Sequence, residues 1–289
     1  MWNHLLILSQ GPHPFNLEAI ICRWRPAEAH PESRQAGVYT TLHLDMYAVV
    51  SDIHGNLEAL EAVLADMPDG IGEIYCLGDV IGYGASPNEC CDLVRSHGMP
   101  VISGNHDLAV TDLSTDLAWF NPVAAAAIEW TREQLNGENA DFLRTRPRML
   151  HEEGTLFVHG SVRDPDEYIM NGAVARENLA VLEAEYPNVR VCFFGHTHVK
   201  TVAPSPNGPS PGSQHVLDLT SGGPYLVNPG SVGQPRDGDT FASYVLAENG
   251  QEGPRIAYRF VEYDVEKAQD KIRAAGLPGM LADRLAHGR

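Results

Sequence analysis

The chain has 289 residues, and its 43 % hydrophobic and 20 % charged content is ordinary for a globular protein. Twenty Lys and Arg residues stand against 38 Asp and Glu residues, which gives a formal net charge of -18. Because a chain with this much negative charge repels polyanions, we expect no nucleic-acid polymer as a partner. No apolar stretch approaches the length that spans a bilayer, so no membrane partner is expected either.

The five cysteines are scattered and form no Cys-x-x-Cys pair. An odd, scattered set is typical of reduced thiols, so the sequence predicts a cytoplasmic protein. The apolar run at residues 5–8 lacks a basic flank and is too short for a signal peptide.

Residues 1–45 differ from the rest of the chain. They show no clear periodicity and contain four prolines that would interrupt any long helix. We expect an N-terminal extension outside the core fold, with Met46 as a candidate start of the native protein. The alternative is a short extra strand near residues 19–24, packed on a sheet edge.

From residue 46 onward, apolar strand-like runs alternate with helical patterns, which predicts a layered α/β fold. The first expected strands cover residues 47–50, 73–77 and 101–103. The expected helices cover residues 57–67, a stretch from 87, residues 124–135 and a short stretch near 140–145. Ser86 and Asn121 are expected N-caps, and each is followed by a proline.

In the second half of the chain, the expected elements are mostly strands, and they include a hairpin. A hairpin is expected over 149–152 and 155–159, followed by a helix over 173–186 and a strand over 190–194. Residues 203–214 are rich in Pro, Gly and Ser and predict a loop. The remaining expected elements are strands over 215–219, 225–227, 243–247 and 255–263, and a helix over 265–275 that ends at Gly276.

Polar clusters follow the ends of five of these apolar runs. They contribute Asp52, His54, Asp79, Asn105, His106, His159, His196 and His198. In open α/β sheets, sites form beyond the carboxyl ends of strands, so these clusters can converge. Carboxylate oxygens and imidazole nitrogens suit first-row divalent metals. Two Asp, one Asn and four His suffice for two metals with one bridging carboxylate, and His106 is left over.

Each cluster alone has a simpler structural explanation. Asp-x-His after a strand can be a helix cap, Gly-Asp a turn, Gly-Asn-His-Asp a loop, Gly-His-Thr-His two surface histidines, and His159 a buried core histidine. All five in this order, each after an apolar run, favour a metal site instead.

This order of motifs resembles that of the calcineurin-like metallophosphoesterase superfamily. The resemblance extends from residue 46 to the C-terminus. It is greatest for small bacterial metallophosphoesterases and predicted phosphodiesterases, whose first strand leads into Ser-Asp-Ile-His-Gly-Asn, as at residues 51–56. It implies an α/β fold, a four-layer α/β/β/α sandwich of two mixed sheets flanked by helices. Residues 46–289 would form this single domain.

The resemblance also implies a role for each ligand. It assigns the first metal to Asp52, His54 and His198, and the second metal to Asn105, His159 and His196. Asp79 would bridge both metals, and His106 would be the proton donor. Two divalent ions are expected, with manganese as the first choice and iron, zinc or nickel as alternatives that fit the same ligands. Such a pair acidifies a bound water and clamps a phosphate.

The sequence departs from the Ser/Thr phosphatases of the superfamily. Gly82 and Tyr83 stand where those enzymes have Asp and a phosphate-binding Arg, and the third motif ends in Asp107 instead of Glu. A protein-phosphatase role is therefore doubtful, and the carboxylate that would orient His106 is missing. Tyr83, Arg163 and Arg236 are candidate substrate contacts, with a plain surface position as the alternative for each arginine.

The expected function is that of a dinuclear-metal phosphoesterase that hydrolyses phosphodiester bonds of a small phosphorylated substrate through a metal-activated hydroxide. The enzymatic alternative is a phosphatase that acts on nucleotides or dinucleoside polyphosphates. A non-catalytic scaffold with the same fold is a third hypothesis, which the completeness of the ligand set disfavours. The sequence leaves the oligomeric state open.

Overall fold

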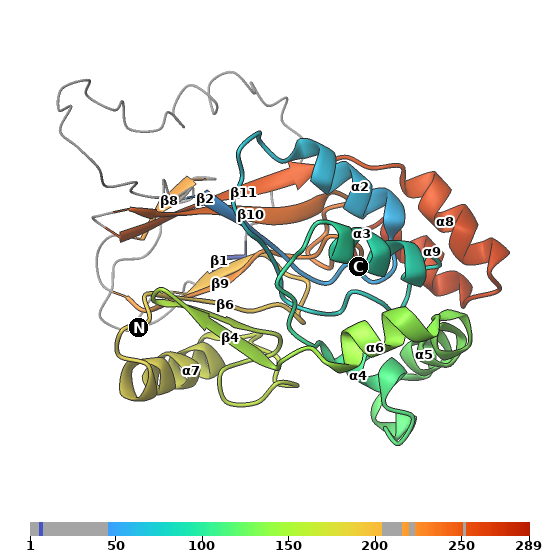
Figure 1. Ribbon diagram of the computed structural model, residues 1–289, viewed down its shortest axis with the longest axis horizontal. Helices are drawn as coiled ribbons and strands as arrows, with labels where there is room; N and C mark the ends of the chain where they lie inside the picture. The colour runs from blue at the N-terminus through green and yellow to red at the C-terminus, as the bar shows by residue number, and fades with distance from the viewer. Residues whose placement is uncertain (1–5, 8–45, 204–215, 220–222, 251–252) are drawn as a thin grey trace, which may run out of the picture. The chain divides into compact units, whose positions relative to one another are not determined.

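The computed structural model describes residues 6–7, 46–203, 216–219, 223–250 and 253–289, and two mixed β-sheets pack face to face in it (Figure 1). The six-stranded sheet has the order β1-β7-β9-β6-β5-β4. Its strands are β1 (Leu6–Ile7), β7 (Thr201–Ala203), β9 (Tyr225–Asn228), β6 (Val191–Phe193), β5 (Thr155–Val158) and β4 (Met149–Glu152). Strands β5, β6 and β9 are parallel, and the others pair antiparallel.

The five-stranded sheet has the order β3-β2-β10-β11-β8. Its strands are β3 (Ile74–Cys76), β2 (Met46–Val50), β10 (Ala242–Gly250), β11 (Gly253–Val261) and β8 (Val216–Asp218). Only β2 and β3 are parallel in this sheet. A parallel pair needs a crossover, and α2 (Leu57–Asp66) supplies it.

The main core lies between the two sheets. Alternate residues of a strand point to opposite faces, and Tyr47 and Val49 of β2 belong to this inter-sheet cluster. Tyr75 of the five-stranded sheet stacks on Phe157 of the other, with ring centroids 4.2 Å apart, and Phe157 stacks on Phe193 at 5.7 Å. The Tyr75–Phe157 contact joins the two sheets directly, and the Phe157–Phe193 contact links neighbouring strands of the six-stranded sheet.

Helices cover the two outer faces. Helix α7 (Gly172–Glu185) buries Leu179 and Leu182 against Leu156 and Val158 of the six-stranded sheet. Helix α2 contacts β10 and β11 on the outer face of the five-stranded sheet (Figure 1). The structure therefore confirms the expected α/β/β/α sandwich.

The remaining helices lie together at one end of the sheets (Figure 1). They are α3 (Pro87–Ser96), α4 (Asn105–Thr111), α5 (Pro122–Gln134), α6 (Gly137–Arg144), α8 (Val265–Ala274) and α9 (Gly279–Leu285), with a short 3₁₀ helix, η1 (Leu117–Trp119). An apolar cluster of α5, α8 and α9 includes Ala127, Ile272 and Leu281, and Tyr83 packs in it. The C-terminal helices thus support the loop that carries Asp79 and Tyr83.

Three differences from the sequence-based expectations concern short elements. The strand expected at 101–103 is a single bridge between Val101 and Cys76. Strand β7 and helices α4 and α9 were not expected. Ser86 precedes α3 but makes no capping bond, whereas the Asn121 side chain accepts from Val123 and Ala124 as expected.

Most of residues 1–45, the strand proposed at 19–24 and nearly all of the loop proposed at 203–214 lie outside the described residues. Ala203 itself belongs to β7, so that loop cannot begin there. Leu6–Ile7 pairs with β7 at the edge of the six-stranded sheet. The extension outside the core stays a prediction. None of the described helices has the length and apolarity to cross a bilayer.

Candidate metal centre

The predicted ligands come together from both sheets. Loops after β2 and β3 of the five-stranded sheet supply one part of the centre, and loops after β5 and β6 of the six-stranded sheet supply the other. The buried side chains form three groups whose ligand atoms lie within 4.8 Å of one another. The first is Asp52, His54 and His198, the second is Asp79, His159 and His196, and the third is His54, Asp79 and His106.

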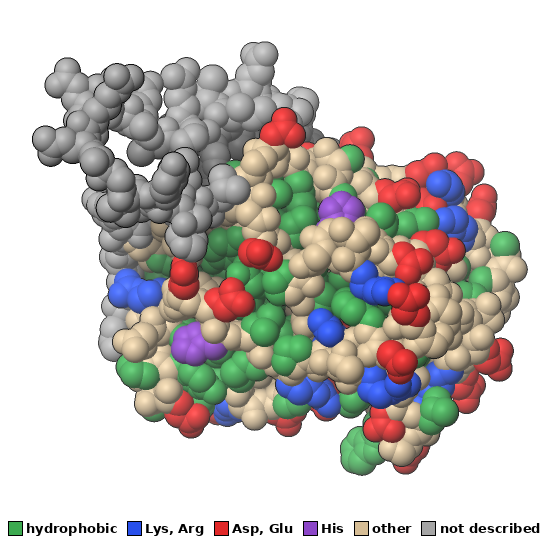
Figure 2. All heavy atoms as spheres, viewed as in Figure 1, with side chains coloured by type: hydrophobic (Ala, Val, Ile, Leu, Met, Phe, Trp, Pro, Cys, Tyr) green, Lys and Arg blue, Asp and Glu red, His purple; other side chains and the backbone are tan. Residues whose placement is uncertain are grey.

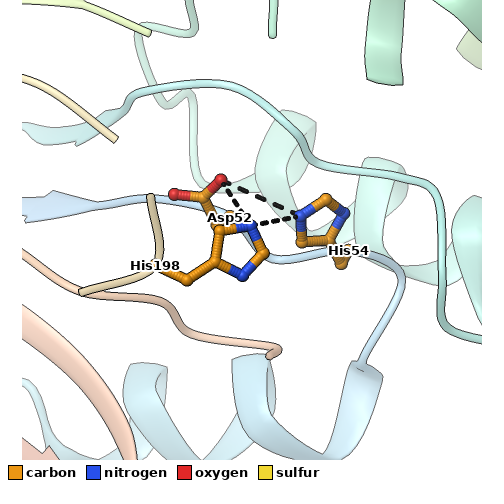
Figure 3. Close-up of side chains that lie close together, drawn as sticks. All are labelled: Asp52, His54 and His198. Carbon is orange, nitrogen blue, oxygen red and sulfur yellow. Dashed lines mark hydrogen bonds and ion pairs between the residues drawn. The ribbon is translucent and has the colours of Figure 1, made fainter. Parts of the chain in front are cut away.

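In the first group, the ligand atoms of Asp52, His54 and His198 point toward one another (Figure 3). Asp52 Oδ1 lies 3.3 Å from His198 Nε2 and 3.8 Å from His54 Nε2, and the two Nε2 atoms are 3.1 Å apart. His54 Nδ1 lies 3.1 Å from the carbonyl of Ile81, and His198 Nδ1 lies 2.6 Å from that of Gln234. A carbonyl only accepts, so each Nδ1 donates its proton and each neutral ring presents an unprotonated Nε2.

Asp79 lies between the first group and the second. Its Oδ1 accepts from the backbone N–H of His106 at 2.8 Å. Its Oδ2 lies 3.6 Å from His54 Nε2 and 3.4 Å from His159 Nε2. One oxygen is thus fixed by the backbone, and the other faces both halves of the centre, as a bridging ligand requires.

The second group follows the same design. His159 Nδ1 donates to the carbonyl of Leu77 at 2.8 Å, which directs its Nε2 toward Asn105 Oδ1 at 3.1 Å. The ring of His196 lies 4.9 Å from that of His159, centroid to centroid.

These donor atoms fit two divalent cations. Asp52 Oδ1 and His196 Nε2 are buried and have no hydrogen-bond partner. Buried polar atoms are nearly always paired, and this set consists of acceptors that face other acceptors. A cation is the partner that such a set lacks, and mixed oxygen and nitrogen donors suit first-row divalent ions.

The electrostatics keep the two carboxyl groups ionised and His196 neutral, which are their metal-binding forms, whereas they favour the protonated form of His159, whose Nε2 proton a cation would displace. Burial alone would raise the pKa of Asp52 and of Asp79, but the neighbouring imidazoles hold the pKa of both carboxyl groups below its usual range. Burial and then His159 lower the pKa of His196 to about 3. Burial would lower the pKa of His159, but Asp79 and Asp52 together raise it to about 10.

The backbone at the centre is strained. Five of the candidate ligands have positive φ values, a region that residues other than glycine rarely adopt: Asp52 (54°), His54 (50°), Asp79 (51°), His196 (64°) and His198 (59°). Such strain persists where the surroundings over-determine it, and it clusters at functional sites. Here the ligand loops fix each other, since the His54 N–H donates to the Asp79 carbonyl at 2.9 Å.

The segment at residues 228–233 secures two of the ligand loops. Asn228 Nδ2 donates to the carbonyl of Gly195 at 2.7 Å and to Thr197 Oγ1 at 3.0 Å. Ser231 Oγ donates to the carbonyl of Asp52 at 2.8 Å. This Asn-Pro-Gly-Ser stretch therefore packs next to the loops of the candidate ligands and stabilises them by hydrogen bonds.

His106 lies beside the centre without a carboxylate to orient it. Its Nδ1 is buried and has no hydrogen-bond partner. Its ring contacts Tyr83 at 4.5 Å and Phe120 at 5.5 Å, centroid to centroid. Asp107 accepts instead from the N–H groups of Gly104 and Ile81 and caps α4. Burial lowers the pKa of His106 to about 4.

The three predicted substrate contacts differ in their hydrogen-bond and ion-pair partners. Arg236 Nη2 lies 3.4 Å from the Tyr83 hydroxyl and 3.1 Å from Gln234 Oε1, and its buried Nε has no hydrogen-bond partner. No carboxylate of the described residues forms an ion pair with Arg236. Arg163, by contrast, pairs with Glu167 and Glu177. All three contacts stay predictions, and of the two arginines only Arg236 lacks a carboxylate partner among the described residues.

Two residues at the centre were missed by the sequence analysis. The ring of Tyr168 lies 3.8 Å from that of His196, centroid to centroid. Lys200 is fully buried two residues after His198 and pairs with Asp237 at 2.6 Å and Asp239 at 3.0 Å. Neither residue belongs to a strand-end motif, and the only available sequence signal was proximity to a ligand.

Residues 46–252 match the calcineurin-like phosphoesterase superfamily domain. The chain belongs to this superfamily. Membership implies a phosphoester hydrolase with divalent metals, and the geometry above supplies candidate ligands.

Two similar proteins extend this comparison. The chain is 39 % identical over 251 residues to the uncharacterized protein MJ0912 of Methanocaldococcus jannaschii, covering 84 % of this chain and 98 % of that protein. A metallophosphoesterase from Sphaerobacter thermophilus is 40 % identical, with a TM-score of 0.70, and covers 84 % of this chain and 99 % of its own.

The hypothetical protein PH1004 of Pyrococcus horikoshii has the same fold. It is 21 % identical, with a TM-score of 0.70, and the match covers 84 % of this chain and 98 % of that chain.

Proposed function

We propose that this protein hydrolyses phosphodiester bonds in a small substrate, using two divalent cations. The observation that carries the proposal is a pair of adjacent buried groups, one formed by Asp52, His54 and His198 and the other by Asp79, His159 and His196. Asp79 Oδ2 lies 3.6 Å from His54 Nε2 and so faces the first group as well. Asp52, His54 and His198 would hold one cation, and Asn105, His159 and His196 would hold the other. Two cations so held would polarise the phosphoryl oxygens and acidify a bound water. Manganese is the first choice, and iron, zinc or nickel would fit the same donors.

The charge of the site favours a diester over a monoester. A phosphate monoester carries between one and a half and two negative charges at neutral pH, as phosphorylated side chains do, and a diester carries one. Tyr83 stands where related phosphatases have an arginine, and Arg236, next to Tyr83, has no carboxylate partner among the described residues. A site that has a tyrosine in place of this arginine has less positive charge beside the cations, which suits the lower charge of a diester.

His106 is the proposed proton donor to the departing oxygen. Its ring lies 5.0 Å from that of the proposed ligand His54, centroid to centroid, and its buried Nδ1 has no hydrogen-bond partner among the described residues. A phosphate anion next to the ring would favour its protonated form and so oppose the effect of burial on its pKa. Proton transfer of this kind contributes about 10²–10⁴-fold to a rate.

The cysteines are the basis for proposing a cytoplasmic location. Cys76, Cys90, Cys91 and Cys192 are free and buried, and burial raises the pKa of each thiol. Buried, protonated thiols are unreactive.

The test compares hydrolysis of bis(p-nitrophenyl) phosphate with that of p-nitrophenyl phosphate. Metal-stripped protein is assayed before and after addition of Mn²⁺, alongside Asp79→Asn. We expect Mn²⁺-dependent cleavage that favours the diester and that Asp79→Asn abolishes. A preference for the monoester would favour the phosphatase alternative, and a wild-type protein that binds no metal would favour the scaffold.

A further inference from the structure

Tyr168 lies over the metal centre. It belongs to the loop between β5 and α7 that follows the ligand His159. The planes of the Tyr168 and His196 rings are 37° apart at a centroid distance of 3.8 Å, so part of the phenol covers this ligand. Yet 48 % of Tyr168 is exposed. The side chain therefore contacts the centre on one side and reaches solvent on the other.

The surroundings of Tyr168 are those of the substrate contacts proposed above. Arg236, Tyr83 and Asp79 all influence its phenol electrostatically. The Arg236 guanidinium and the exposed part of the Tyr168 ring are thus both near the candidate metal ligands.

The loop holds Tyr168 in place. Glu167 accepts from Ser161 Oγ at 2.7 Å, from Asn178 Nδ2 at 2.8 Å and from Arg163 Nε at 3.2 Å. Ile169 on the other side is buried in the cluster beneath α7. An exposed ring fixed between two anchored neighbours loses little further freedom when a ligand binds, which favours affinity.

The start of the loop is equally constrained. A side chain at Gly160 would place its Cβ 2.3 Å from the carbonyl oxygen of Pro165, so only glycine allows the loop to fold back next to His159. The Arg163 network, which neutralises Glu167 and Glu177, is therefore an anchor for this loop.

We propose that Tyr168 binds the substrate and that the substrate has an aromatic group, a nucleobase or an aryl ring, on its phosphoester. The proposal rests on the function proposed above and names the substrate class of the same site. The phosphate would lie at the cations and Arg236, and the aromatic group would stack on the exposed part of the Tyr168 ring. Substrates with only aliphatic groups would lack this contact.

The test measures binding, so that it does not depend on turnover. Mn²⁺-loaded protein is titrated calorimetrically with phenyl phosphate, adenosine 5′-phosphate and methyl phosphate. We expect the wild type to bind at least one aromatic ligand about fivefold more tightly than methyl phosphate, as aromatic pairs allow. Tyr168→Ala should abolish this preference and Tyr168→Phe should keep it. A preference for the nucleotide alone would identify a nucleobase, and a preference for both would indicate any aryl group.

Tyr186→Ala is the matched control, because Tyr186 also packs against a histidine ring, that of His151 at 6.0 Å. It should leave the preference unchanged. The proposal is overturned if the wild type shows no aromatic preference, if Tyr168→Ala retains it, or if Tyr168→Ala and Tyr168→Leu both lose Mn²⁺. A wild type that shows the preference but hydrolyses neither ester would contradict the proposed function alone.

Discussion

Asp79 shows how single atoms define this site, because its two oxygens have different tasks. One is fixed by the His106 N–H, and the other faces His54 and His159. The histidine ligands use the same principle, since a backbone carbonyl on Nδ1 sets the tautomer and directs Nε2 inward. The convergence of these candidate ligands was predictable from the motifs, but their hydrogen-bond partners depend on contacts between distant residues.

His106→Ala tests the role of the remaining histidine. The imidazole contacts Tyr83 and Phe120 but belongs to neither proposed ligand set. We expect the turnover number for the diester to fall about 10²–10⁴-fold, with two Mn²⁺ ions still bound. The measurement is steady-state hydrolysis with metal analysis of the same sample. Unchanged turnover with full metal content would rule out this role.

Gly82→Ala tests whether packing orients His106 in place of a carboxylate. Gly82 has a φ of 100°, and a Cβ there would lie 2.6 Å from His106 Nδ1. We expect lower turnover together with a loss of about 1–2 kcal/mol in the free energy of unfolding. Gly70→Ala is the control, because Gly70 has a φ of 80° and no atom near its missing Cβ. Both substitutions should destabilise, measured in urea, and only Gly82→Ala should slow turnover.

At the scale of elements, residues 234–237 and residues 198–200 are joined by hydrogen bonds and a buried ion pair. The Arg236 N–H donates to the His198 carbonyl, and Gln234 accepts from the His198 ring. Lys200 and Asp237 form a buried ion pair across the same contact. This arrangement fixes a metal ligand and the unpaired arginine together.

Lys200→Met should therefore be strongly destabilising. It leaves Asp237 buried without its partner, and breaking such a pair costs about 3–5 kcal/mol. Replacing both residues, as Lys200→Met with Asp237→Asn, should recover part of the loss. Arg144→Met, which removes an exposed pair with Asp141, should have no measurable effect. Equal urea midpoints for Lys200→Met and Arg144→Met would contradict the importance of the buried pair.

The long elements of the fold were predictable, because strands β10 and β11 and helices α5, α7 and α8 have periodic apolar positions. The three-residue strands β3, β6 and β8 were also predictable, because each lies in a longer apolar run. Strand β7 lies in no such run, and α4 and α9 have only seven residues each, so these three were missed. At 101–103 the chain makes one bridge because Ser103 donates to the Pro147 carbonyl instead of continuing the ladder. Tertiary contacts, and not the local sequence pattern, therefore determine the structure of these short segments.

At the scale of the whole molecule, the centre lies where the two sheets meet. The five-stranded sheet supplies Asp52, His54 and Asp79, and loops of the six-stranded sheet supply His159 and His196. On the face in Figure 2, acidic side chains gather along the upper right margin, in keeping with the net charge of -18. The cations would offset, at one point, the repulsion that such a surface exerts on a phosphate ester.

Removal of the metals should destabilise the whole fold, because the ligands join both sheets. Free metal at 100 times its Kd stabilises the native state by about 2.7 kcal/mol per site. We expect a chelator to lower the urea midpoint, with far-ultraviolet circular dichroism and tyrosine fluorescence changing together. A midpoint that does not respond to the chelator, or one that shifts for a single probe only, would contradict this coupling.

The most direct test of the metal centre is the number of Mn²⁺ ions bound per chain at equilibrium, measured for the wild type and for Asp79→Asn. The side chains that converge on Asp79 predict two ions for the wild type and weakened binding at both positions in the variant. A wild type that binds fewer than two ions, or a variant that binds both with unchanged affinity, would contradict a dinuclear centre bridged by Asp79.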